Sequence, residues 1–216
     1  MPFTLSNLSN QLDASGIRKV FELRESLENP IDLSIGQPDF SVPKTLKQSA
    51  INAIDNDFNG YTLTQGYLPL IDSINSNIYD EFDISINESS LSTMITSGTS
   101  GGIFLAFLAL LNCNDEVIIP DPWFVIYPAL AKMVGAIPIS CDLYPDFRMT
   151  ADKIKPLITD KTKAIVLNSP GNPTGVVLSR DELKAITKLC RENNIVLISD
   201  EIYDLFYYGN EDSLPS

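Results

Sequence analysis

A chain of 216 residues, of which 44% are hydrophobic and 20% charged, can bury a sizeable core and has the composition of a globular protein. Its formal net charge of −13 argues against non-specific binding to nucleic acid or to an anionic membrane, since both require clustered lysine and arginine. The chain contains no histidine, which excludes Ser-His-Asp and Cys-His catalysis and histidine-based metal sites.

The cysteines and the first residues bear on the cellular compartment. Cys113, Cys141 and Cys190 are widely spaced and form no Cys-x-x-Cys pair, which is typical of buried thiols in a reducing compartment. The first twenty residues contain no basic stretch followed by an apolar run, and the most apolar stretch, 103–111, is too short to span a bilayer. We therefore expect a soluble cytoplasmic protein.

The first third of the chain contains three helical patterns. Residues 1–45 are polar and irregular apart from a helical stretch over 17–27. Beyond them, apolar residues recur at helical spacing in two groups, Ile51, Ile54 and Phe58, and then Leu70, Ile71, Ile74 and Ile78. These patterns predict two further helices before residue 90.

From residue 90 the pattern alternates between strands and helices. The predicted strands are 91–96, 117–119, 137–140, 164–167 and 196–199. The predicted helices are 103–111, 124–133, 151–158 and one that begins at Ser179, which has capping-box spacing to Glu182. Such alternation predicts an α/β protein with a parallel sheet covered on both faces. Because ligands bind at the carboxyl ends of the strands in such sheets, a site is expected there.

The first strand end is followed by residues 97–102 (SGTSGG), predicted as a loop before a helix. Glycines let the backbone approach a ligand closely, and the N–H groups of a helix start, with the hydroxyls of Thr99 and Ser100, suit a phosphate. Taken alone, a Gly/Ser loop in this position is more often a simple connector.

Two later strand ends also carry polar residues. Strand 164–167 runs into 168–175 (NSPGNPTG), eight turn-forming residues that exceed the needs of one tight turn and could hold an asparagine side chain against a ligand. Strand 196–199 runs into Asp200, whose burial would be costly unless the carboxylate is paired. Asp200 is then either a helix cap or a carboxylate that faces a cationic ligand atom.

An ordered set of short motifs along nearly the whole chain resembles one enzyme family. The matching segments are 15–18, 35–40, 60–66, 96–101, 115–117, 122–124 with Tyr127, 168–175 and 199–203. Together they resemble class I/II aminotransferases, the aspartate aminotransferase family of pyridoxal-phosphate (PLP) enzymes of fold type I. The implied fold is α/β, with a mostly parallel sheet, helices on both faces and the N-terminal part of a small domain.

The resemblance implies PLP as the cofactor and gives individual residues roles around its ring. Asp200 would pair with the pyridine nitrogen and keep it protonated, so that the ring can accept electrons. Asn172 and Tyr203 would hydrogen-bond the ring O3′. Phe124, two residues after Pro122, would stack on the ring face.

The resemblance also implies a phosphate site and contacts to the substrate. The phosphate would be bound by Thr99, Ser100 and Gly101. The backbone of Gly36 and the side chain of Asn172 would approach the substrate carboxylate, although Gln37 stands where glutamate is commoner.

Two aromatic residues have roles that depend on neighbouring parts of the enzyme. Trp123 would line the substrate pocket or pack nearby. Tyr61 matches a tyrosine that reaches the PLP phosphate of a partner subunit, so a homodimer is implied.

The resemblance also predicts how the chain is organised. Residues 1–45 would be an N-terminal arm and the start of a small domain, and residues 46–216 an incomplete large PLP-binding domain. The family's Schiff-base lysine lies in a Ser-x-Ser-Lys type motif some tens of residues after Tyr203, which places it beyond Ser216. No catalytic residue is therefore assigned, and we expect a fragment that is inactive on its own.

The leading function is amino-group transfer between an amino acid and a 2-oxo acid. A PLP-dependent C–S β-lyase of the same fold shares every motif, and a non-catalytic remnant that keeps the cofactor site also remains open. A PLP-dependent transcription regulator is disfavoured, because no helix-turn-helix or basic stretch precedes residue 30. A dinucleotide-binding protein is disfavoured because 97–102 is not a GxGxxG motif. No nucleic acid, membrane or metal partner is expected.

Overall fold

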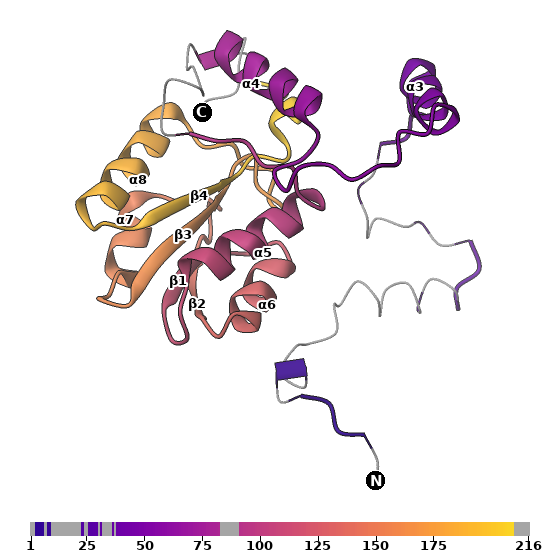
Figure 1. The fold of residues 1–216 in the computed structure, drawn as a ribbon. Coiled ribbons are helices and arrows are strands. Elements are labelled where there is room, and N and C mark those ends of the chain that lie inside the picture. Colours follow the sequence, from indigo (N-terminus) through magenta and orange to yellow (C-terminus); the bar gives the residue numbers. More distant parts are fainter. Residues whose placement is uncertain are drawn as a thin grey trace. The chain divides into compact units, whose positions relative to one another are not determined.

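The computed structural model describes residues 3–6, 8–9, 23, 26–29, 31, 36, 38–82 and 91–209. The motif at 15–18, Gln37 and most of the helix expected over 17–27 lie outside these residues. The chain divides into two compact units, one formed by Ala14–Thr96 and the other by Met1–Asp13 with Ser97–Ser216. Figure 1 labels the main helices and strands along the chain.

The unit Ala14–Thr96 contains both helices expected between residues 46 and 90. They are α3 (Lys44–Asp55) and α4 (Leu68–Phe82). Phe58 lies beyond the end of α3, so the helical spacing extended further than the helix itself. Gly66 has a φ of +121°, and a Cβ at this position would lie 2.5 Å from Cγ1 of Ile95, so the turn before α4 requires glycine.

The predicted strand over 91–96 is wrong. These residues belong to no described strand, and they are held by contacts to earlier residues of the first unit. The Ile95 N–H donates to the Gln65 carbonyl at 2.8 Å, and the Thr93 hydroxyl donates to Oδ1 of Asn75 at 2.6 Å. A strand needs a neighbouring strand edge, which the apolar pattern of one segment cannot reveal.

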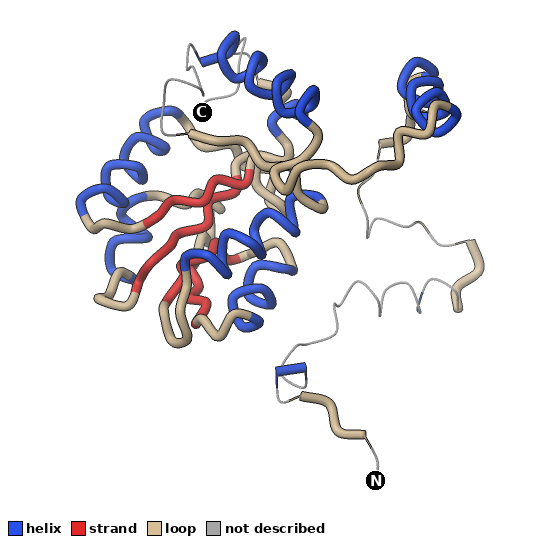
Figure 2. Tube along the Cα trace, in the orientation of Figure 1, coloured by secondary structure: helices blue, strands red, loops and turns tan. Residues whose placement is uncertain are grey.

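The second unit contains the remaining four predicted strands in one parallel sheet of order β2-β1-β3-β4. Figure 2 shows the strands of this sheet in red and the helices in blue. The strands are β1 (Glu116–Asp121), β2 (Ile137–Asp142), β3 (Thr162–Asn168) and β4 (Val196–Asp200). The helices of this unit are α5 (Gly98–Leu110), α6 (Ile126–Met133), α7 (Ala151–Ile154) and α8 (Arg180–Glu192). The α/β architecture expected from the alternation of elements is confirmed.

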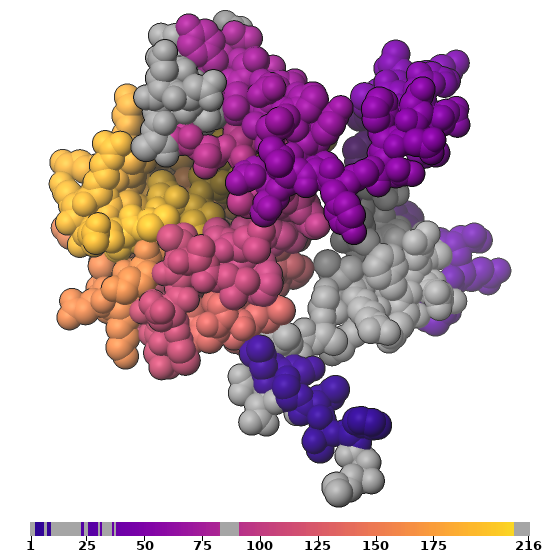
Figure 3. All heavy atoms as spheres, viewed as in Figure 1, coloured from indigo at the N-terminus to yellow at the C-terminus, as the bar shows by residue number. Residues whose placement is uncertain are grey.

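Helices cover both faces of this sheet, which explains why its central strands are apolar almost throughout. Alternate residues of β1 and β3 enter two separate cores. The core shared with α5 and α6 takes Val117, Ile119, Ala164 and Val166, and the core shared with α7 and α8 takes Ile118, Ile165 and Leu167. In Figure 3 the atoms of 97–209, from magenta to yellow, form one continuous packed body.

The helix predicted over 103–111 begins earlier, so the loop predicted at 97–102 is also wrong. Ser97 is the N-cap residue, and the glycines that follow form the first turns of α5. Ile103 and Phe107, one turn apart, are buried in the core, and their packing extends the helix back through residues of low helix propensity. The residues expected to bind phosphate therefore lie on a helix start and not before it.

The other helices of this unit mostly follow the predicted pattern. The capping box at the start of α8 is confirmed, with Ser179 accepting from the Glu182 N–H at 3.3 Å and donating its own N–H to Glu182 Oε2 at 2.7 Å. The helix predicted over 151–158 ends at Ile154 and continues as a 3₁₀ turn, Lys155–Leu157, because Pro156 has no N–H for an α-helical bond.

Two further expectations concern cysteines and membrane spans. Cys141 and Cys190 are buried as expected, whereas Cys113 is exposed, because it lies in the turn after α5 and before β1. Among the described residues, no helix has both the length and the apolar character needed to cross a membrane.

Candidate functional site

The last residues of β3 and β4 lie side by side at the carboxyl edge of the sheet, where Asn168 is in register with Asp200. Nδ2 of Asn168 donates to the backbone carbonyl of Asp200 at 2.8 Å. Oδ1 of the same side chain accepts from the backbone N–H of Asn172 at 2.7 Å. Asn168 therefore joins the end of β4 to the loop that follows β3.

Asp200 is a buried carboxylate with neutral partners. Its side chain is 5% exposed, and its Oδ2 accepts a hydrogen bond of 2.7 Å from the hydroxyl of Tyr127, which is fully buried. Its Oδ1 accepts from the N–H of Ile202 at 3.4 Å. Within 38–82 and 91–209, no lysine or arginine forms an ion pair with Asp200. A buried carboxylate is costly without a compensating cation, so this position is suited to a cationic ligand atom.

The protonation of Tyr127 suits its role as a donor. Burial, reinforced by the hydrogen bond to Asp200 and by its negative charge, raises the pKa of the Tyr127 hydroxyl well above its ordinary value. The hydroxyl therefore keeps its proton at any physiological pH. It orients the carboxylate of Asp200 without cancelling its charge.

An aromatic group stands beside this carboxylate, at the start of α6. The rings of Phe124 and Tyr127 meet edge to face, with centroids 5.8 Å apart and an interplanar angle of 79°. Phe124 and Trp123 are partly buried and pack against the core between the sheet and α5 and α6. Phe124 is thus held near Asp200 through Tyr127.

The loop after β3 carries Asn172 and folds tightly on itself. Nδ2 of Asn172 donates to the hydroxyl of Tyr203 at 3.0 Å. The Gly171 N–H donates to the Val176 carbonyl at 3.0 Å. A Cβ on Gly171 would lie 2.9 Å from the Thr174 hydroxyl and 3.3 Å from the Asn168 carbonyl, so the loop leaves little room for a side chain there.

Thr99, Ser100 and Gly101 occupy the first turn of α5. In Figure 1 this end of α5 lies at the same end of the sheet as the carboxyl ends of β3 and β4. The first N–H groups of an α-helix have no acceptor within the helix, and the helix dipole favours an anion beside them. Thr99 and Ser100 are exposed, so their hydroxyls are open to a ligand.

Apart from Trp123, which packs against the core of the second unit, the sequence-predicted site residues fall into three groups. Phe124, Asn172, Asp200 and Tyr203 are joined by contacts within the second unit, partly through Tyr127 and Asn168. Thr99, Ser100 and Gly101 stand on α5 of the same unit. Gly36 and Tyr61 belong to the unit Ala14–Thr96, where both are exposed. All of these roles remain predictions.

Two residues that shape the site were not among the predicted site residues. Tyr127 donates to Asp200, and Asn168 links Asp200 to Asn172. Both lay within the quoted motifs, and a buried acid at a strand end requires a donor. The sequence did not indicate which side chain would supply that donor.

Comparison with known proteins gives one consistent result. The family model described as "Aminotransferase class I and II" matches residues 28–215. The chain is 34% identical over 206 residues to the aromatic-amino-acid aminotransferase 2 of Thermococcus litoralis, covering 94% of this chain and 53% of the relative. It is 35% identical over 196 residues to the aspartate aminotransferase of Bacillus sp. strain YM-2, covering 89% of this chain and 50% of the relative.

Solved structures agree with these sequence matches. The aspartate aminotransferase of Thermus thermophilus with maleate superposes with a TM-score of 0.88 at 29% identity, covering 99% of this chain and 57% of that structure. The chain spans about half the length of the relatives that it matches.

Proposed function

Because this chain belongs to the class I and II aminotransferase family, we propose that it is the amino-terminal half of a PLP-dependent transaminase. The complete enzyme would move an amino group between an amino acid and a 2-oxo acid. The observation that carries this proposal is Asp200, a buried carboxylate at the carboxyl edge of the sheet whose donors among the described residues are neutral.

The residues around Asp200 fit the pyridine ring of PLP. When bound, the cofactor supplies a protonated ring that withdraws electrons from the substrate Cα. Asp200 would hold the proton on the ring nitrogen, and that cation would offset the cost of burying the carboxylate. Tyr127 would keep the carboxylate in the orientation that this contact requires.

The other chemical groups of the cofactor match donors in the same unit. Asn172 and Tyr203, already hydrogen-bonded to each other, would bind the ring O3′. Phe124 would pack against the ring face and orient it by dispersion. The first turn of α5, with Thr99, Ser100 and Gly101, would bind the phosphate through N–H groups and hydroxyls.

Apart from Trp123, the remaining parts of the proposed enzyme lie outside the second unit. None of the ten lysines of this chain stands in a Ser-x-Ser-Lys motif, and we place the reactive lysine in the second half of the full-length protein. Gly36 and Trp123 would contact the substrate. Tyr61 would bind the PLP phosphate of a partner subunit in a homodimer.

A C–S β-lyase is the alternative function, and it would use the same cofactor site. The relatives reported above are named as aminotransferases, which favours amino-group transfer.

The proposal is tested by changing Asp200 to Asn in the full-length protein, the polypeptide in which this chain is joined to the second half of the family fold. The substitution keeps the shape of the side chain and removes its charge. We expect kcat for amino-group transfer, measured with a panel of amino acids and 2-oxo acids, to fall at least about 10²-fold. PLP affinity should fall in parallel.

Glu201→Gln is the matched control, because Glu201 is the neighbouring acid, is exposed and is bonded to the Ser199 hydroxyl at 2.6 Å. It should leave kcat within about twofold of the parent value. Near-normal turnover in the Asp200 variant would contradict the assignment of Asp200. A parent protein that neither binds PLP nor transfers an amino group would refute the proposed function.

A further inference from the structure

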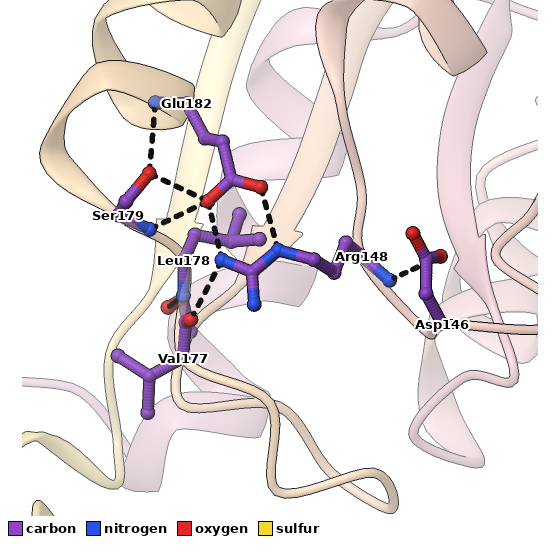
Figure 4. A network of polar contacts seen from close by, with 7 residues as sticks. Asp146, Arg148, Val177, Leu178, Ser179 and Glu182 are labelled. Carbon is purple, nitrogen blue, oxygen red and sulfur yellow. Dashed lines mark hydrogen bonds and ion pairs between the residues drawn. The ribbon is translucent and has the colours of Figure 1, made fainter. Parts of the chain in front are cut away.

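A side chain from the β2–α7 connection reaches the far end of the loop that carries Asn172. The guanidinium of Arg148 donates from Nη2 to the Val177 carbonyl at 3.1 Å and from Nε to Glu182 Oε1 at 2.6 Å, and Nη2 also contacts Glu182 Oε2 (Figure 4). One side chain therefore binds both the last part of the loop and the first turn of α8. The fork geometry of arginine suits such a double contact.

The loop, residues 169–178, is held at both ends. At its start, Asn172 donates its N–H to Asn168 Oδ1 at 2.7 Å. At its end, the Leu178 N–H donates to the Ser169 hydroxyl at 3.0 Å, and Val177 accepts from Arg148. Between these points the loop projects the Asn172 side chain toward Tyr203. Val176, the neighbour of Val177, accepts from the N–H of Gly171 at 3.0 Å, so one backbone hydrogen bond connects the Val177 end of the loop to the residue before Asn172.

The segment that carries Arg148 is itself strained and braced. Phe147 has a φ of +57°, which is unfavourable for a bulky residue and persists only where the surroundings impose it. Its N–H donates to the Leu143 carbonyl at 2.7 Å, and its ring packs edge to face on Tyr144 with centroids 4.9 Å apart. Lys153 binds the Leu143 carbonyl at 3.0 Å and Asp146 at 2.6 Å. The backbone before Arg148 is thus fixed by contacts that do not involve the Asn172 loop.

The two segments also meet through apolar side chains. Leu143, Phe147 and Met149 line one small hollow together with Asn172 and other residues of its loop.

The carboxylate of Glu182 carries the charge opposite to that of Arg148. The hydrogen bond from Arg148, together with the N-cap contacts of Ser179, lowers the pKa of Glu182 to about 2. Glu182 is therefore ionised at neutral pH.

We propose that Arg148 is a positioning residue for Asn172, which it holds in place by bracketing residues 169–178 between the β2–α7 connection and α8. This inference rests on the proposed function, because it assigns Asn172 a contact with the cofactor. Arg148 touches neither cofactor nor substrate in this scheme and acts through the Val177 carbonyl and Glu182.

The first test measures the loop without any cofactor. Amide hydrogen exchange of 169–178 is compared by mass spectrometry in the full-length protein and in Arg148→Gln, Arg148→Lys and Lys188→Gln. We expect exchange in this segment to be about tenfold faster in Arg148→Gln. Arg148→Lys should have a smaller effect, because an ammonium cannot make the forked contact. Lys188→Gln removes an exposed cation whose ion-pair partner is Glu192, the last residue of α8, and it should leave this segment unchanged.

The second test asks whether Arg148 acts through Asn172. The dissociation constant for PLP is measured in a double-mutant cycle of Arg148→Gln and Asn172→Ala. Arg148→Gln should weaken binding about three- to tenfold when Asn172 is present and should have no effect in the Asn172→Ala background. Arg148→Lys replaces Arg148→Gln in the cycle if the latter variant does not fold.

The outcomes separate the two proposals. If amide exchange of 169–178 is unchanged in both Arg148 variants, Arg148 does not hold this loop in place and the proposal is wrong. If Arg148→Gln lowers PLP affinity equally in the parent and in the Asn172→Ala background, Arg148 does not act through Asn172. A parent protein that binds no PLP would refute the proposed function, while the exchange measurement would still decide whether Arg148 holds the loop.

Discussion

Asp200 and Tyr127 form the contact on which the candidate site depends most. A lysine or arginine in place of Tyr127 would neutralise the buried carboxylate, leaving little reason for a cationic ligand atom to bind. A neutral hydroxyl satisfies one oxygen of Asp200 and leaves its charge in place. At the residue scale, the choice of a tyrosine donor is what keeps this carboxylate suited to a protonated ring nitrogen.

Replacing Tyr127 with Phe in the full-length protein tests this contact. The ring that packs on Phe124 is retained, but Oδ2 of buried Asp200 loses its donor. We expect the free energy of unfolding to fall by about 1–3 kcal/mol, measured by urea denaturation, and PLP affinity to fall with it.

The control is Tyr208→Phe, which removes a hydroxyl from a side chain that is 89% exposed and should change stability by less than about 0.5 kcal/mol. If the two variants are equally stable, the Tyr127–Asp200 contact contributes nothing to the fold.

At the scale of elements, the starts of two helices, α5 and α8, bear on the candidate site. Early turns of α5 present the N–H groups assigned to phosphate, and the start of α8 anchors the end of the Asn172 loop. The capping box at Ser179 and the contact with Arg148 share one side chain, that of Glu182. Because Glu182 serves both contacts, the stability of this junction should depend on its charge.

The pH dependence of stability tests this junction through Glu182→Gln, which keeps a capping side chain and removes the charge. The pKa of Glu182 is about 2 in the folded chain and near 4.5 in the unfolded chain, so its ionised form stabilises the fold. That stabilisation is complete above about pH 4.5 and is lost as the pH falls from 4.5 to 2. Because both partners are partly exposed, we expect a difference of about 1 kcal/mol at pH 7.

Urea denaturation of the parent and the variant between pH 2 and pH 7 should therefore give curves that converge at the acid end. Glu192→Gln is the control, since its contact with Lys188 on the same helix is 3.8 Å long and exposed. It should show no comparable convergence. A constant difference between the parent and Glu182→Gln across this range would mean that the charge of Glu182 is not the cause.

Several apolar surfaces of the second unit are not covered within the described residues. α5 is apolar on all sides, and its Leu105 and Leu108 are 48% and 54% exposed. A helix that is apolar on every side is normally buried. At the scale of the whole molecule, these surfaces agree with a chain that spans about half the length of its relatives. The expected boundary between a small and a large domain near residue 45 stays a prediction about the full-length protein.

We expect the 216-residue chain by itself to show no transaminase activity. Any PLP that it binds should be held without a covalent bond, because no lysine stands in the required motif. The measurement is to purify this chain, add PLP, reduce with borohydride and search for a lysine adduct by mass spectrometry. A stoichiometric adduct at one lysine, together with turnover of an amino acid, would contradict the placement of the reactive lysine in a second half.

Local sequence determined the elements of the sheet and the polar character of its carboxyl edge. The apolar runs of β1, β3 and β4, the capping pair Ser179 and Glu182, and the acid that ends β4 are all readable from neighbouring residues. Local pattern failed for residues 91–96, where strand formation depends on a partner, and for the start of α5, where packing outweighs the low helix propensity of glycine.

Only the tertiary structure decided which side chains meet at that edge. The Tyr127 hydroxyl reaches Asp200 across 73 positions, Asn168 reaches Asp200 across 32, and Arg148 reaches Glu182 across 34. Periodicity specifies the face on which a side chain lies, but not the register of one strand against another or the path of a loop. These contacts arise when the strands pair and the helices pack, so a local sequence pattern could indicate the residues and not their partners.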